Sequence, residues 1–99
     1  MKKIVLASLL AASSLFAHSA LMSCFDNGDG TITCEGGFSD GSSASGVGFF
    51  VKQGDNTVEN GKMDQYSEFT FKKPAGEYQA VFDAGEGHQV VIQGKDIVQ

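Results

Sequence analysis

Short runs in which apolar and polar residues alternate constrain this chain more than any other feature. Each run is rich in β-branched or aromatic residues and is bounded by Gly, Asp, Asn or Pro, as β-strands are. No window of helical length shows an amphipathic stripe, and thirteen glycines leave turns at hairpin spacing. Strands are therefore predicted at residues 31–38, 47–53, 57–63, 68–72, 77–84 and 89–93. The predicted fold class is all-β, a small antiparallel β-sandwich.

The alternation also predicts which side chains form the core, because residues two apart on a strand share a face. Three sets share a face in this way and should meet between two sheets: Val47, Phe49 and Val51; Phe69 and Phe71; and Tyr78, Ala80 and Phe82. The same alternation turns Phe50 to the opposite face. An aromatic ring exposed there would favour contact with another protein, although two adjacent aromatic residues in a twisted strand can equally be buried on both sides.

The first residues have the pattern of a secretory signal peptide, predicted at residues 1–17. Lys2 and Lys3 form a basic start, and residues 4–16 are apolar or small, a run too short to span a bilayer as a stable anchor. Residues 18–99 are then predicted to form one domain that is exported to the periplasm or secreted.

Three cleavage positions are possible, and each gives the mature chain a different first residue. Cleavage after Ala17 makes His18 the mature amino terminus, whereas cleavage after Ala20 discards that histidine. The residues Leu-Met-Ser-Cys at 21–24 also form a passable lipobox, which would make Cys24 a lipid anchor. Membrane attachment is expected only in that third case.

The mature chain is strongly acidic, which excludes two classes of partner. Seven lysines face twelve carboxylates without any arginine, and removal of Lys2 and Lys3 leaves a net charge of about −7. A nucleic-acid-binding surface needs clustered Lys and Arg to neutralise phosphates, and this surface would repel them. The same charge disfavours anionic lipid headgroups, whereas it raises the local concentration of cations.

Cys24 and Cys34 are predicted to form a disulfide across a hairpin. Export places both thiols in an oxidising compartment, and a turn centred on Asp29 would set them directly opposite each other. Lipidation of Cys24 or a redox role stays open beside this structural bridge.

Residues 26–30, Asp-Asn-Gly-Asp-Gly, resemble part of a calcium-binding loop but fail on spacing. In an alignment to such a loop, Phe25 and Gly36 occupy the first and last ligand positions, where carboxylates are required. The segment is therefore predicted to be a hairpin tip.

Motifs for catalysis are absent from the sequence. It contains no nucleophile elbow, no phosphate-binding glycine loop, no zinc-protease helix and no dinucleotide fingerprint. The carboxylates lie mostly in predicted turns, where solvation explains them. We therefore expect no enzymatic activity and assign no catalytic residue.

Several segments together resemble a known family. They are Gly-Phe-Ser-Asp-Gly at 37–41, Gly-Lys-Met-Asp at 61–64, Glu-Phe-Thr-Phe at 68–71, Pro-Ala-Gly-Glu-Tyr at 74–78 and Val-Phe-Asp-Ala-Gly at 81–85. Over residues 31–92 this order resembles the carboxypeptidase-regulatory-like, transthyretin-type β-sandwich. Ser67 departs from the pattern, because such sequences usually place Gly in that turn. Within this group, Asp-Ala-Gly-Glu-Gly-His at 83–88 is similar to a segment of the periplasmic accessory proteins of nickel and cobalt importers.

That resemblance implies a role in transition-metal handling beside a membrane metal-transport complex. In such accessory proteins, and in several exported copper-handling domains, the mature chain begins with histidine. If His18 is the first residue here, its amine and imidazole could chelate Ni(II) or Cu(II), with His88 as a second imidazole. Met22 and Met63 could add thioether ligands for Cu(I), although methionine in so small a domain is more often core filler.

Two alternatives to the metal site stay open. His18 could be lost with the signal peptide, and His88 could be an ordinary turn residue bonded to the backbone. The protein would then be an interaction or structural module that docks another exported protein, with Phe50 as the candidate contact.

Overall fold

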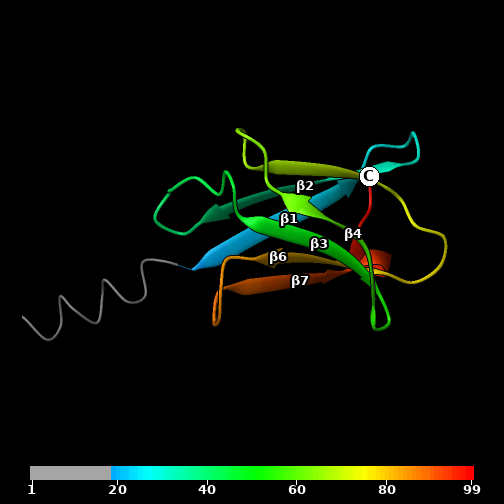
Figure 1. The fold of residues 1–99 in the computed structure, drawn as a ribbon. Helices are drawn as coiled ribbons and strands as arrows, with labels where there is room; N and C mark the ends of the chain where they lie inside the picture. The colour runs from blue at the N-terminus through cyan, green and yellow to red at the C-terminus, as the bar shows by residue number, and fades with distance from the viewer. Residues whose placement is uncertain (1–18) are drawn as a thin grey trace, which may run out of the picture.

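Seven β-strands form two antiparallel sheets that face each other in the computed structural model, which describes residues 19–99 (Figure 1). The three-stranded sheet has the order β1 (Ala20–Asp26), β2 (Thr31–Phe38) and β5 (Glu68–Lys72). The four-stranded sheet has the order β4 (Asn56–Lys62), β3 (Gly48–Gln53), β6 (Gln79–Asp83) and β7 (Gln89–Gln93), and a 3-10 turn, η1 (Gly94–Asp96), follows it. The predicted all-β sandwich is confirmed. The predicted signal peptide at 1–17 and His18 lie outside the described residues.

The strand boundaries agree closely with the alternation pattern. β2, β5 and β7 begin and end at the predicted residues, and the ends of β3, β4 and β6 differ by one or two residues. β1 begins four residues before Cys24, so the predicted hairpin of residues 24–34 is part of a longer one. In residues 19–99 no helix is long and apolar enough to cross a membrane.

The core lies between the sheets and contains the predicted side chains. Phe49 and Phe82 of the four-stranded sheet are fully buried, as is Ile32 of β2. The ring of Phe49 stacks on that of Phe69 in the opposite sheet, with centroids 4.5 Å apart, and it contacts Phe71 at 5.7 Å. The three predicted sets therefore meet between the two sheets.

Phe50 faces away from this core, as the alternation predicts. It is half-buried and pairs with Val81 of β6, which in turn pairs with Val91 of β7. These three residues form an apolar row across the outer face of the four-stranded sheet. The edge strand β4 beyond them is polar and has a β-bulge at Val58, and both features protect an open sheet edge from pairing with another chain.

Cys24 and Cys34 are bonded to each other, which confirms the predicted disulfide. They are directly opposite in the ladder of β1 and β2, as a turn centred on Asp29 requires. The sulfur of Cys24 is therefore not available for a lipid. Processing before Cys24 would also remove the first four residues of β1, from Ala20 to Ser23, all of which pair with β2. Lipid attachment at Cys24 is incompatible with this arrangement.

Ser67 adopts a left-handed backbone conformation with a φ of 63°. Its hydroxyl accepts a 2.9 Å hydrogen bond from the backbone N–H of Ala44, a residue without exposed surface. The serine thus occupies a glycine-like conformation, and a bond to a buried donor offsets the backbone strain.

We expect Ser67→Ala to lower the free energy of unfolding by about 1–2 kcal/mol, because it keeps the strain and leaves the Ala44 N–H unpaired. Ser67→Gly should lower the free energy of unfolding by less, because relief of the backbone strain offsets part of the lost hydrogen bond. Urea denaturation of both variants measures the difference. A glycine variant that is less stable than the alanine variant would contradict this explanation.

Candidate functional site

Of the two predicted metal ligands, His88 lies at one corner of the sandwich, and His18 is outside the described residues. β1 and β7 lie in contact as edge strands of opposite sheets, and they run in the same direction (Figure 1). His88 immediately precedes β7, while His18 is two positions before β1 in the sequence. The fold therefore brings the beginnings of these two strands, 69 positions apart in the chain, to the same end of the molecule (Figure 1).

His88 completes the turn between β6 and β7, and its imidazole is exposed. Its backbone N–H donates to the carbonyl of Gly85 at 2.9 Å, and its carbonyl accepts from the N–H of Ala84 at 3.1 Å. The Asp83 carboxylate accepts from the Gly85 N–H and from the Gln89 amide, both at 3.1 Å. The backbone thus fixes this turn, whereas the imidazole has no hydrogen-bond partner among residues 19–99 and is free to bind a ligand.

Metal-binding side chains are otherwise sparse in the part of the chain that the structure describes. Residues 19–99 contain no group of three or more His, Cys, Asp or Glu side chains placed to hold a metal ion. Met63 is 3% exposed and belongs to the core, and Met22 packs against it, so both act as core filler. His88 is the one histidine among residues 19–99, and these residues alone do not form a metal site around it.

The turn between β1 and β2 is a hairpin tip, as predicted. The Gly28 N–H, at 2.8 Å, and then the Lys73 ammonium, at 3.0 Å, lower the pKa of Asp26. The Thr31 hydroxyl and N–H, at 2.6 and 3.0 Å, lower the pKa of Asp29. Both carboxylates are occupied by the turn and by Lys73 and are not arranged around a cation.

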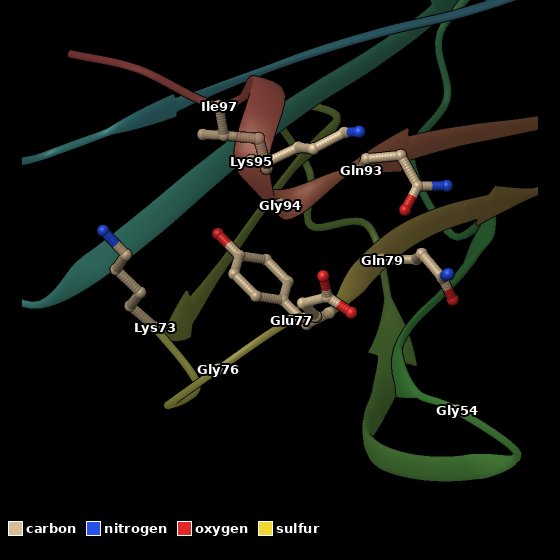
Figure 2. Close-up of a pocket in the computed structure, with 10 residues that line it drawn as sticks. Gly54, Lys73, Gly76, Glu77, Gln79, Gln93, Gly94, Lys95 and Ile97 are labelled. Atoms are coloured by element: carbon tan, nitrogen blue, oxygen red, sulfur yellow. The ribbon is translucent and has the colours of Figure 1, made fainter.

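A second candidate site, which the sequence did not predict, is a cleft of about 570 Å³. One wall is the turn between β5 and β6, and the other is η1 with Ile97 (Figure 2). The β5–β6 turn and η1 lie at the opposite end of the sandwich from the β6–β7 turn, which carries His88 (Figure 1). Most of its lining side chains are polar: Lys73, Glu77, Gln79, Gln93 and Lys95.

Hydrogen bonds fix both walls of the cleft. The Gln53 amide donates to the carbonyls of Ala75 and Glu77, at 2.7 and 3.0 Å, and so ties the β5–β6 turn to the end of β3. On the other side, the Gly94 N–H donates to the Tyr78 carbonyl at 2.7 Å. The cleft is therefore formed before any ligand arrives, which reduces the entropy that binding must overcome.

Tyr78 forms the base of the cleft. Its ring meets that of Phe71 edge-on, with centroids 6.1 Å apart, and it lies so close to Gly94 that an added Cβ would overlap it. The hydroxyl is buried without a hydrogen-bond partner among residues 19–99, and burial raises its pKa above the usual value. Such an unpaired hydroxyl destabilises the folded state.

We expect Tyr78→Phe to raise the free energy of unfolding by about 1 kcal/mol, because it removes a buried polar group and keeps the ring. The midpoint of urea denaturation at neutral pH measures this change. A loss of stability would mean that the hydroxyl is hydrogen-bonded in solution.

The unpaired polar groups of the cleft are the most relevant to binding. Within residues 19–99, the side chains of Glu77, Gln79, Gln93 and Lys95 make no hydrogen bond or ion pair. Lys73, in contrast, is bound to Asp26 at 3.0 Å. The cleft therefore presents one free carboxylate, one free ammonium group and two amides.

A scan against protein-family models, a search of curated proteins and a search of solved structures each found no match to this chain. Function must therefore be inferred from the residues at the two ends of the sandwich.

Proposed function

We propose that the protein is an exported module without catalytic activity that binds nickel or copper where β1 and β7 begin. The main support is that β1 and β7 are in contact and run in the same direction, so the turn that carries His88 lies at the end of the sandwich where β1 begins (Figure 1). Cleavage after Ala17 would leave His18 as the first residue. Its amine and imidazole, with the exposed imidazole of His88, would supply nitrogen donors that suit Cu(II) and Ni(II). A periplasmic role beside a membrane metal-transport complex, which the family resemblance implies, belongs to this proposal.

The hydrogen bonds of Ser19 favour processing after Ala17 over processing after Ala20. The Ser19 carbonyl accepts from the Ser39 N–H, and the Ser19 N–H donates to the Ser39 hydroxyl, both at 2.9 Å. Cleavage after Ala20 would remove both bonds together with the first residue of β1. Cleavage after Ala17 keeps the whole strand and its contacts.

Amino-terminal sequencing of the exported protein, followed by calorimetric titration with Ni(II) and Cu(II), tests this function. We expect His18 as the first residue, and binding that is weakened about tenfold or more in His88→Ala through loss of one ligand. Glu86→Ala, in the same turn, is the matched control and should leave the affinity unchanged. A mature chain that starts at Leu21, or full affinity in His88→Ala, would rule the proposal out. Absence of heat with both metals would favour the interaction module instead.

A further inference from the structure

We propose that the cleft between the β5–β6 turn and η1 binds a short peptide with free amino and carboxyl termini. The segments that line the cleft are at the other end of the sandwich from the β6–β7 turn, so this activity does not depend on metal binding at His88 (Figure 1).

The two charged side chains of the cleft that have no ion pair belong to different walls. Glu77 belongs to the β5–β6 turn, and Lys95 belongs to η1 (Figure 2). Lys73 is already neutralised by Asp26, so the lining residues offer one unpaired charge of each sign. A carboxylate and an ammonium group that face one opening match a ligand carrying the opposite pair, an ammonium group and a carboxylate.

The two amides of the cleft add uncharged hydrogen-bonding groups to these two charges. Gln79 of β6 and Gln93 of β7 are directly paired in the ladder, so their side chains share the outer face of the sheet at the cleft. Each amide can donate and accept a hydrogen bond. A peptide bond needs both a donor and an acceptor as partners, which distinguishes a peptide from a ligand that carries charges alone.

The size and rigidity of the cleft also suit such a ligand. Its volume of about 570 Å³ lies in the range of about 300–1,000 Å³ that is usual for small-molecule sites. Because Gln53 holds one wall and the Gly94–Tyr78 bond holds the other, the charged groups are carried by fixed backbone. The lining exposes apolar as well as polar surface, so it can contact the small side chains of a short peptide as well as its polar groups.

Titration of ¹⁵N-labelled mature protein with trialanine tests the site by NMR. We expect amide shifts confined to residues 53–54, 73–79 and 93–97, and about tenfold weaker binding of trialanine that is acetylated at its amino end or amidated at its carboxyl end. No shifts at millimolar trialanine, or shifts at other residues, would overturn the proposal. Equal binding of the blocked peptides would overturn the recognition of free termini.

Two variants assign each terminus to its partner. In Glu77→Gln, acetylation of the peptide should no longer weaken binding, and in Lys95→Gln, amidation should no longer do so. Glu86→Gln and Lys62→Gln remove the same charges outside the cleft and should behave as the wild type. If acetylation and amidation still weaken binding to their full extent in the two cleft variants, Glu77 and Lys95 do not contact the peptide termini. The cleft variants should bind Ni(II) and Cu(II) with the affinity of the wild type, so failure of the peptide test would not count against the metal site at His88.

Discussion

Replacing Phe49 with alanine is expected to lower the free energy of unfolding by about 3–5 kcal/mol, the usual loss for a large aromatic side chain in a core. Phe49 is 1% exposed, and its ring stacks on Phe69 and contacts Phe71 in the opposite sheet. The variant loses buried apolar surface and leaves a cavity between the two sheets. Urea denaturation of the disulfide-bonded protein measures the effect.

Phe50→Ala is the matched control, because it removes the same side chain from the next position of the same strand. Phe50 is half-buried on the outer face, so its loss should cost about 1 kcal/mol and leave no core cavity. Equal effects of the two substitutions would contradict the assignment of the faces of β3.

Removal of the disulfide is expected to lower the free energy of unfolding by about 2–3 kcal/mol, because the bond restricts the unfolded chain. It joins residues ten positions apart in β1 and β2, and Cys34 has no exposed surface. The measurement compares urea midpoints of the wild type and the Cys24→Ala/Cys34→Ala double variant, each with and without reductant. Reductant should move the midpoint of the wild type towards that of the double variant and leave the variant unchanged. A wild-type midpoint that does not respond to reductant would contradict a structural role for the bond.

Most of the fold could be predicted because its strands follow the simple period of two. Phe49 and Phe50 point to opposite faces, as adjacent residues in a strand must. β1 was found only in part, because Ala20 to Ser23 overlap the possible processing sites and contain no β-branched residue. The conformation of Ser67 could be anticipated only as a departure from a glycine turn, and its bond to Ala44 depends on a contact between distant loops.

The candidate sites were predictable to different degrees. His88 stood out because the chain has only two histidines, and a glycine-rich turn after a strand was readable from sequence. The contact between β1 and β7 could not be predicted from the sequence, because it depends on how the two sheets pack. The cleft between the β5–β6 turn and η1 was not predicted at all. Glu77 and Lys95 are charged residues in turns eighteen positions apart, a pattern that ordinarily indicates only solvation.

Paramagnetic broadening by Cu(II) in NMR spectra of the mature protein tests the metal site most directly, because a bound Cu(II) ion weakens the signals of amides close to it. The account predicts that substoichiometric Cu(II) removes first the signals of residues 19–20 and 84–89, which belong to the beginnings of β1 and β7. Broadening that starts at the Asp26–Asp29 turn or at the peptide cleft, or that spreads evenly over the acidic surface, would contradict it.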